Sequence, residues 1–287
     1  MTDELEHVEP ETPPTGDERG EIPRLSPRIP KIPPCIIVFI SGPVASGKSW
    51  LIQQLVNKME RVLINDVTAE YSGDNYTHIW SNPKELAEFL RDHPYAFRIA
   101  YHPNSAVMDE EFHWMFSAIW QLEQPRWFVI EECHNVCDAS SIHSDMENLL
   151  RYARHNLLGV IGSSQRIADV HKLLTSSARM VILFHTTEAR DLQAIRDRFG
   201  DDAMRAVEQL RPCIYNDATK DVEQHPECLI YVRGRGFAVV ELGTKTKSET
   251  GDNEQWEELS QDQPPKQDQP SLEQDTGQSE KNSSEST

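Results

Sequence analysis

The sequence of 287 residues predicts an α/β fold, in which a mostly parallel sheet is flanked by helices and followed by a C-terminal β-hairpin. Two observations predict this fold, and a third predicts disordered ends. Short apolar segments without polar alternation are typical of strands that are covered on both faces. Helical patterns lie between these segments, with short connections, and this alternation favours parallel strands joined by crossover helices. Both ends of the chain are polar and acidic, and we expect them to be disordered tails.

The apolar segments give the order of the expected strands, which are residues 35–41, 61–66, 97–101, 127–131, 159–164 and 180–184. The helical patterns occupy residues 47–59, 83–91, 107–122, 144–156, 167–175 and 188–199. The last of these ends at Gly200, and glycine is common directly after a helix. Residues 229–242 predict a β-hairpin that turns near 234–236 and closes the domain.

Composition divides the chain into one folded domain, residues 31–245, between tails at residues 1–30 and 246–287. The first tail is acidic and proline-rich, and the second is rich in Gln, Ser, Asp and Glu. Neither can bury enough apolar surface to offset the entropy of ordering. The net charge is −19, of which residues 1–30 carry −5 and residues 251–287 carry −8. The remaining −6 excludes a histone-like basic protein and a generally cationic membrane binder.

The sequence predicts neither secretion nor membrane insertion, because acids stand where a signal peptide needs basic residues and no apolar segment reaches about 20 residues. Five cysteines are an odd number, and we expect free thiols in a reducing compartment. Cys133, His134, Cys137 and His143 lie close together in sequence. Their spacing matches no common zinc pattern, so core packing is the favoured interpretation.

The most specific motif is GPVASGKS at residues 42–49, which fits G-x-x-x-x-G-K-[ST] and stands between a predicted strand and a predicted helix. Backbone N–H groups of such a loop, with the positive end of the helix dipole, bind phosphate oxygens. We therefore predict ATP and Mg²⁺ as cofactors, with Lys48 on the β- and γ-phosphates and the Ser49 hydroxyl on the metal. The predicted nucleotide-binding residues of this segment are Gly42, Pro43, Val44, Ala45, Ser46, Gly47, Lys48, Ser49 and Trp50.

Polar side chains follow several of the predicted strands, at the sheet edge where ligands bind in open α/β folds. Glu131 and Glu132 end the strand at 127–131, and we assign Glu131 to the metal and Glu132 to orienting water as a general base. Asp66 ends the second strand and Glu70 follows it, and we predict that both are nucleotide-binding residues. Gln165 follows the fifth strand, where its amide can contact a γ-phosphate. The commoner form of the acid pair begins with Asp, and Glu131 is one methylene longer.

These motifs resemble the FtsK–HerA superfamily of P-loop ATPases. The matching segments are GPVASGKS, LINDVTAEY, FVIEECHN, RYARHNLLGVIGSSQR and ARDLQAIRDRFG, between residue 42 and about residue 199. The resemblance implies a RecA-like (ASCE) fold and ATP hydrolysis coupled to translocation of double-stranded DNA by a homo-oligomeric ring, commonly a hexamer. It also implies an arginine supplied by a neighbouring subunit. The segment before Gln165 places that catalytic role on Arg154, with Arg151 as a rival.

Because the core is compact and lacks an added helicase domain, the chain resembles the small genome-packaging ATPases of tailless, membrane-containing double-stranded DNA viruses. This resemblance implies a location in the host cytoplasm or in the virion. It leaves two alternatives for the acidic tails, which are docking to a capsid or portal protein and suppression of nonspecific DNA binding. Arg233 and Arg235 in the predicted hairpin turn are candidates for contact with DNA phosphates.

Two other functions remain open. The first is a small-molecule or nucleotide kinase, which uses the same loop but needs an arginine-rich lid, and no such cluster follows Gln165. The second is a non-catalytic ATP-binding assembly protein, of the filament-extrusion type, that binds ATP and oligomerises without turnover. The guanine signature N-K-x-D is absent, because Thr219-Lys220-Asp221 does not fit it.

Overall fold

The computed structural model describes residues 22, 24–25, 32–216 and 221–243, which all belong to one compact unit. The predicted C-terminal tail, 246–287, lies outside the described residues, as does most of the predicted N-terminal tail. Two residues of that N-terminal segment form a short strand, β1 (Arg24–Leu25), which pairs in parallel with the final strand of the chain. The N-terminal segment therefore contributes to the sheet before residue 31.

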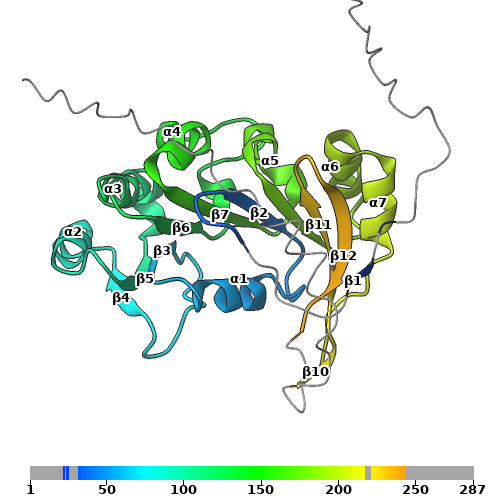
Figure 1. Cartoon of the computed structure of the whole chain (residues 1–287), viewed down its shortest axis with the longest axis horizontal. Helices are drawn as coiled ribbons and strands as arrows, with labels where there is room; N and C mark the ends of the chain where they lie inside the picture. Colours follow the sequence, from blue (N-terminus) through cyan, green and yellow to red (C-terminus); the bar gives the residue numbers. More distant parts are fainter. Residues whose placement is uncertain (1–21, 23, 26–31, 217–220, 244–287) are drawn as a thin grey trace, which may run out of the picture. The chain divides into compact units, whose positions relative to one another are not determined.

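A ten-stranded sheet forms the centre of the unit (Figure 1). Seven neighbouring strands are parallel, in the spatial order β8 (Met180–Phe184), β2 (Ile37–Ser41), β7 (Leu158–Ser164), β6 (Arg126–Ile130), β3 (Arg61–Asn65), β5 (Phe97–His102) and β4 (Thr77–Trp80). Beyond β8 the sheet continues with the antiparallel pair β11 (Glu227–Val232) and β12 (Gly236–Glu241), and then β1. A separate two-stranded sheet is formed by β9 (Ile214–Asn216) and β10 (Asp221–Gln224).

Helices cover both faces of the sheet. Figure 1 shows α1 (Lys48–Val56) on one face, and on the other face α3 (Met108–Trp120), α4 (Ser144–Tyr152), α5 (Lys172–Ser177) and α6 (Ala189–Phe199). Next to these lie α2 (Pro83–Asp92), which contacts α3, and α7 (Asp201–Glu208), which contacts α6. The single-turn 3-10 helices are η1 (Ser105–Val107), η2 (Cys133–Asn135), η3 (Ala153–Asn156) and η4 (Ile167–Asp169).

One large cluster of buried side chains joins the sheet to the helices α2 to α7, and Leu51 and Ile52 of α1 are also fully buried. Phe39 and Phe128 of the sheet belong to the same cluster as Phe112 of α3 and Met146 of α4. The ring centroids of Phe112 and Phe128 lie 5.8 Å apart. Burial of each such side chain contributes roughly 1.5–3 kcal/mol to folding, so this cluster fixes the strands from which the functional loops extend.

The predicted fold class is confirmed, and each of the six predicted strands is present within two residues of its expected bounds. The predicted C-terminal hairpin is also present, since β11 and β12 pair from Glu227↔Glu241 to Val232↔Gly236. The helix predicted at 144–156 is α4 followed by η3, and that at 167–175 is η4 followed by α5. η4 and α5 are separate elements because Val170 and His171 between them are extended. The His171 amide donates to the Cys137 carbonyl.

Several elements carried no pattern strong enough to predict. The strand β4 has the sequence THIW, in which only Ile79 is buried, and a four-residue edge strand shows no clear alternation. Helix α7 follows α6 after one residue, Gly200, whose left-handed φ of 92° is unfavourable for other residues and turns the chain between the two helices.

Cys133 and Cys137 are buried in the core cluster, as the favoured interpretation of their spacing predicted. Burial raises the pKa of both thiols, which keeps them protonated at neutral pH. Among the described residues, every helix is too short or too polar to cross a bilayer.

Candidate functional site

The predicted phosphate loop connects β2 to α1 at the carboxyl edge of the sheet. Gly42 packs so closely on β8 that a Cβ atom there would lie 2.5 Å from Phe184 Cβ. Gly47, which begins α1, has a left-handed φ of 98°, where a side chain would be strained. The Gly42 amide donates to the Ser164 carbonyl at 3.3 Å, which ties the loop to the neighbouring strand β7. The two glycines of the motif are therefore required by local geometry.

The Lys48 side chain curls back over the loop. Its Nζ donates to the Gly42 carbonyl at 2.6 Å and to the Pro43 carbonyl at 3.1 Å, and the residue is 8 % exposed. Burial lowers the pKa of Lys48, while the charges of Glu132, Glu131 and Glu70 oppose that shift. The ammonium group is thus held at the mouth of the loop, close to carboxylates, with backbone carbonyls as its hydrogen-bond partners.

Sheet order brings the predicted polar side chains to the same edge as the loop. The strands β2, β7, β6 and β3 are parallel neighbours, and their carboxyl ends carry Gly42, Gln165, Glu131 and Asp66 in that order. Since β7 lies between β2 and β6, Gln165 stands between the phosphate loop and the acid pair. One edge of the sheet therefore gathers side chains that are separated by up to about 120 residues in the sequence.

Glu131 is a buried carboxylate with two hydroxyl donors. The Tyr71 hydroxyl donates to its Oε1 at 2.5 Å, and the Ser163 hydroxyl of β7 donates to its Oε2. Burial raises the pKa of Glu131, and the two hydroxyl contacts only partly offset that shift. These contacts fix the position of the carboxylate, and within the part of the chain that the structure describes its hydrogen-bond donors are neutral hydroxyl groups.

Asp66 holds in place the turn that carries Tyr71. Its Oδ1 accepts the Glu70 amide at 3.0 Å and its Oδ2 accepts the Tyr71 amide at 3.1 Å, so the carboxylate closes the turn that carries Tyr71 to Glu131. Asp66 is 1 % exposed, and contact of its side chain with a nucleotide stays a prediction. Glu70 is exposed at the same edge; its charge adds to the effect of burial in raising the pKa of Glu131, and it opposes the effect of burial on the pKa of Lys48.

Glu132 is held by two side chains in an unusual backbone conformation. Its φ of 46° is left-handed, which is uncommon for a residue other than glycine and is often found at functional positions. The Gln165 amide donates to Oε1 at 2.9 Å, and His134 Nδ1 lies 3.3 Å from Oε2. Although burial acts to raise the pKa of Glu132, the contacts with His134 and Gln165 lower it below its usual value. The carboxylate is therefore ionised at neutral pH and suited to accept a hydrogen bond from water.

The residues at this edge fit a divalent cation. The Ser49 hydroxyl makes no hydrogen bond within the described residues and lies in the first turn of α1. The buried Asn65 Oδ1, at the end of β3 beside β6, also has no partner there. Three carboxylates, those of Glu132, Glu131 and Glu70, act on the Lys48 ammonium group. Oxygen donors with excess negative charge are what Mg²⁺ prefers, and Ser49 and Glu131 are the residues that would hold it.

Replacing Glu131 by glutamine should raise the melting temperature of the protein without nucleotide or Mg²⁺ at neutral pH. Because the folded-state pKa of Glu131 is raised, its contribution to stability is greatest at low pH and is lost as pH rises through that value. The neutral amide avoids this loss, and the Ser163 hydroxyl can turn to accept from it. Thermal unfolding of both proteins over a pH series tests this, and the difference should shrink on acidification. A glutamine variant that melts lower at neutral pH would contradict it.

The predicted trans arginine lies at the other edge of the sheet. Arg154 is exposed on η3, directly before the amino end of β7, and makes no ion pair with any described residue. The seven residues of β7 span roughly 20 Å, so Arg154 cannot reach the phosphate loop of its own subunit. Arg151 is paired with Glu147 at 2.6 Å. Arg233 donates to the Ala178 carbonyl and other carbonyls at the end of α5, so its guanidinium is engaged in the structure.

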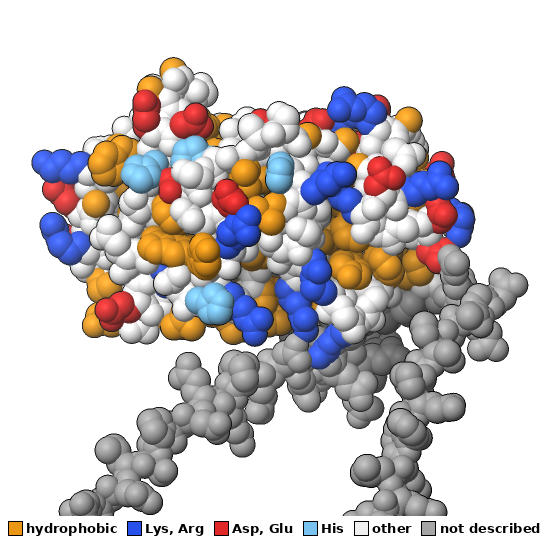
Figure 2. Space-filling model, turned by 90° about the horizontal axis from the view of Figure 1, so that it is seen from above, with side chains coloured by type: hydrophobic (Ala, Val, Ile, Leu, Met, Phe, Trp, Pro, Cys, Tyr) orange, Lys and Arg blue, Asp and Glu red, His pale blue; other side chains and the backbone are white. Residues whose placement is uncertain are grey.

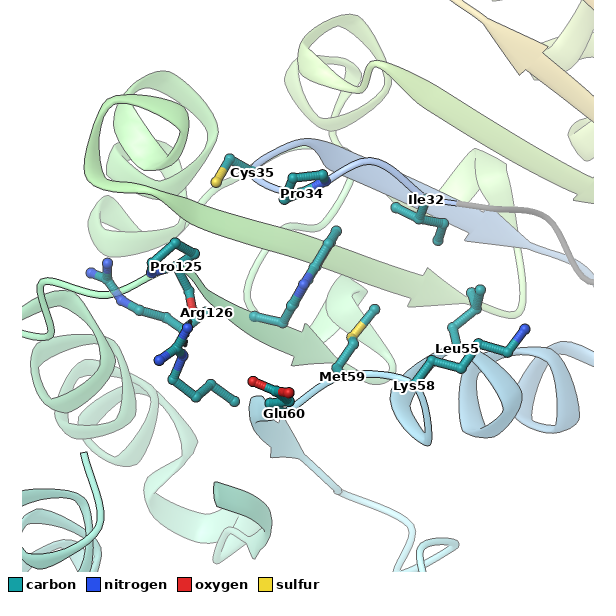
Figure 3. A pocket seen from close by; sticks show the side chains of 11 residues that line it. Ile32, Pro34, Cys35, Leu55, Lys58, Met59, Glu60, Pro125 and Arg126 are labelled. Carbon is teal, nitrogen blue, oxygen red and sulfur yellow. Dashed lines mark hydrogen bonds between the residues drawn. The ribbon is translucent and has the colours of Figure 1, made fainter. Parts of the chain in front are cut away.

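A cavity of about 440 Å³ lies away from this edge (Figure 3). It opens at the amino ends of β2, β3 and β6, beside the C-terminal end of α1, and its walls include Ile32, Pro34, Cys35, Met59 and Arg126. None of the predicted site residues lines it. Volume alone would favour this cavity, but the loop, the lysine and the carboxylates assemble at the opposite edge, so the chemistry places the candidate site there.

Comparison with known proteins adds a structural match and no sequence match. No protein-family model matches the chain, and no curated protein does. Among solved structures, the genome-packaging NTPase B204 of Sulfolobus turreted icosahedral virus 2, in complex with AMPPCP, superposes with a TM-score of 0.60 at 20% identity. The match covers 74% of this chain and 100% of that chain. The chain has the fold of a P-loop ATPase. The B204 DNA-packaging ATPase of Sulfolobus turreted icosahedral virus matches with a TM-score of 0.56 at 19% identity, over 74% of this chain and 99% of that one.

This P-loop ATPase fold is the one that the resemblance to the FtsK–HerA superfamily predicted. B204 of Sulfolobus turreted icosahedral virus 2 has also been solved in complex with ATP-γS, and that structure matches 72% of this chain at 20% identity. At that identity the match establishes the fold, and the roles of individual residues depend on the geometry described above.

Sequence reasoning missed three contributors to the site. Tyr71 lies within the LINDVTAEY motif, but nothing in its spacing indicated contact with Glu131. Ser163 is the next-to-last residue of β7, and only the pairing of β7 with β6 brings its hydroxyl to Glu131. His134 was considered only as a zinc ligand, whereas it contacts Glu132.

Proposed function

We propose that the protein is an ATP-driven translocase of double-stranded DNA, of the viral genome-packaging type, that works as a homo-oligomeric ring, a hexamer. The observation that carries the proposal is the assembly of the phosphate loop, Glu131, Glu132 and Gln165 at one sheet edge. The fold shared with packaging NTPases supports it. ATP and Mg²⁺ are the proposed cofactors.

In the proposed mechanism the triphosphate lies on the loop amides, with Lys48 exchanging its two carbonyl partners for phosphate oxygens. Ser49 and Glu131 would hold Mg²⁺, which when bound neutralises phosphate charge. Glu132, fixed between Gln165 and His134, accepts a proton from the attacking water or orients it. Gln165 donates a hydrogen bond to Glu132. In the proposed mechanism, loss of the γ-phosphate after hydrolysis alters this hydrogen bond. The charge of the Glu132 carboxylate also acts on Lys48 of the loop.

The position of Arg154 supports an oligomer. Arg154 is exposed at the amino edge, is unpaired among the described residues and lies too far from the phosphate loop of its own subunit, so it is available to the site of another copy. An arginine supplied in trans contributes a factor of about 10³–10⁵ to turnover in related chemistry. An isolated subunit would therefore bind ATP but hydrolyse it slowly.

The amino edge is also where we place contact with DNA. Arg154 precedes β7, Arg179 precedes β8, and Arg233 and Arg235 lie in the turn between β11 and β12. Figure 2, which looks down on α3 to α6, shows acidic and basic side chains interspersed, with several Lys and Arg side chains together near the lower margin of this face. A group of cations on an otherwise acidic chain suits binding of phosphates at a limited surface.

The test of this function is steady-state ATP hydrolysis, measured together with mass in solution, with and without linear double-stranded DNA. We expect DNA to stimulate turnover of the oligomer. Arg154→Ala subunits should hydrolyse ATP at least about a hundredfold more slowly alone, yet form active sites next to wild-type subunits when mixed. Arg91→Ala, an exposed arginine of α2 paired with Asp92, is the matched control. Turnover that is indifferent to DNA would favour the kinase or assembly alternatives, and mixtures that follow simple averaging would remove Arg154 from a trans role.

A further inference from the structure

We propose that a second cavity, beside the phosphate loop on the side away from Glu131, is a nucleobase subsite that accepts purine rings by their faces and discriminates weakly between adenine and guanine. This inference rests on the proposed function, because it concerns the same nucleotide. The cavity has a volume of about 130 Å³ and lies between residues 43–46 of the loop, the end of β8 and the segment that enters β11. Beyond the loop, the residues that line this cavity carry no motif in the sequence.

The direction of the bound nucleotide follows from the sheet order. Glu132 and Gln165 lie on the β7 and β6 side of the loop, so a γ-phosphate that faces them leaves the other end of the nucleotide on the opposite side. That side is β8 and β11, where the cavity opens. The wall is in direct contact with the loop, since a Cβ atom on Gly47 would lie 3.0 Å from Pro226 Cγ. A nucleotide held at the loop thus extends its base toward this cavity.

The walls offer flat and apolar surfaces. Pro212 and Pro226 line the cavity with Phe184 and His185 of the β8 end, and these rings suit contact with the face of a purine. Proline and imidazole faces are indifferent to the hydrogen-bonding edge of the base. An apolar pocket of this kind discriminates between similar ligands far less than a site built from hydrogen-bonding groups.

The charged groups of the cavity are engaged elsewhere. Arg211 contacts Glu227 Oε1 at 3.2 Å and Glu241 Oε2 at 2.6 Å. Glu227 also pairs with Arg24 of β1 at 2.6 Å and accepts the Arg211 amide at 3.0 Å. Because these partners satisfy both side chains, neither is available to recognise the edge of a base. The same network fixes the segment that carries Pro226, whose carbonyl accepts the Leu242 amide at 2.9 Å.

The chain contains its own reporter for occupancy of this cavity. Cys213 lines the cavity and is partly exposed, whereas Cys35 is partly exposed in the cavity at the opposite edge. Cys133, Cys137 and Cys228 are buried. Alkylation of the full-length protein with iodoacetamide, resolved by peptide mass spectrometry, therefore compares an occupied cavity with an internal control. Burial raises the pKa of both reporter thiols, so all arms are run at the same alkaline pH.

The experiment compares AMPPNP, GMPPNP and inorganic tripolyphosphate, each with Mg²⁺ and each at saturation established by calorimetry. We expect both nucleotides to slow alkylation of Cys213 at least about fivefold, tripolyphosphate to leave it unchanged, and Cys35 to react equally in every arm. Equal protection by tripolyphosphate, or nucleotide binding without protection, would overturn the subsite. Affinities of the two nucleotides that differ by more than about a hundredfold would overturn its weak discrimination. If none of the three ligands binds, the proposed function itself fails, which is a different result.

A variant separates the base from the phosphates. His185→Ala should weaken binding of AMPPNP between about fivefold and a hundredfold, the range found when a side chain that stacks on a base is removed. It should leave the affinity for tripolyphosphate unchanged. His155→Ala, exposed on η3 at the amino edge, is the matched control and should change neither affinity. An equal loss for both ligands in His185→Ala would show a general disturbance of the loop and contradict the assignment.

Discussion

Replacing Lys48 by alanine is expected to abolish ATP binding. The ammonium group is fixed at the loop by two carbonyls, where we propose that the phosphates bind. A hydrogen bond to a charged group contributes about 1.5–3 kcal/mol, and Lys48 would make more than one, so the affinity should fall by roughly 10²–10⁴. Isothermal titration calorimetry with ATP and Mg²⁺ measures this directly. An unchanged affinity would show that residues 42–49 are not the ATP-binding loop.

The Lys48→Ala result can be separated from unfolding. Because burial lowers the pKa of Lys48, the protonated side chain costs stability at neutral pH, and its removal should not lower the melting temperature substantially. Lys58→Ala provides the matched control, since Lys58 is exposed beyond the other end of α1. That variant should bind ATP as the wild type does.

Replacing Glu132 by glutamine is expected to leave ATP binding intact and to slow hydrolysis at least about a hundredfold, the usual scale for loss of a general base. The amide keeps the size of the side chain and can still accept from Gln165, but it cannot take a proton from water. Loss of the carboxylate also removes the charge that faces His134. Single-turnover hydrolysis with pre-bound ATP measures the chemical step separately from binding and release.

The control for Glu132→Gln is Glu110→Gln, in the exposed first turn of α3, which should retain wild-type turnover. Turnover at the wild-type rate in Glu132→Gln would exclude Glu132 as the base and leave the neighbouring Glu70, exposed at the same edge, as the next candidate. Loss of binding as well as hydrolysis would show that Glu132 shapes the nucleotide site instead.

The sequence pattern predicted those strands and loops whose structure depends on residues that are close in the sequence. The buried strands are continuous apolar segments, and the phosphate loop is a contiguous motif whose glycines meet local steric demands at Gly42 and Gly47. The acid pair follows the end of β6, so its place at the carboxyl edge of a parallel sheet follows from the fold class. Gln165 could be placed for the same reason.

What local pattern could not predict depends on pairing between distant strands. Ser163 reaches Glu131 only because β7 lies beside β6, and Tyr71 reaches it only because Asp66 closes the turn after β3. Pro226 contacts the phosphate loop because β11 pairs with β8, an arrangement fixed by burial across the whole sheet. The position of Arg154 at the amino edge follows from its place before β7, but the neighbouring site that we propose for it cannot be located from a single chain.

An experimental structure of the protein with AMPPNP and Mg²⁺ tests most directly whether the nucleotide binds at the phosphate loop beside Glu131 and Glu132. We expect the phosphates on the amides of residues 42–49, the metal between Ser49 and Glu131, and Glu132 facing the γ-phosphate. We also expect that Lys48 has left the Gly42 carbonyl for a phosphate oxygen. Phosphates bound in the cavity at the amino ends of the strands, or a nucleotide on the loop with Glu131 and Glu132 turned away from it, would contradict the central claim.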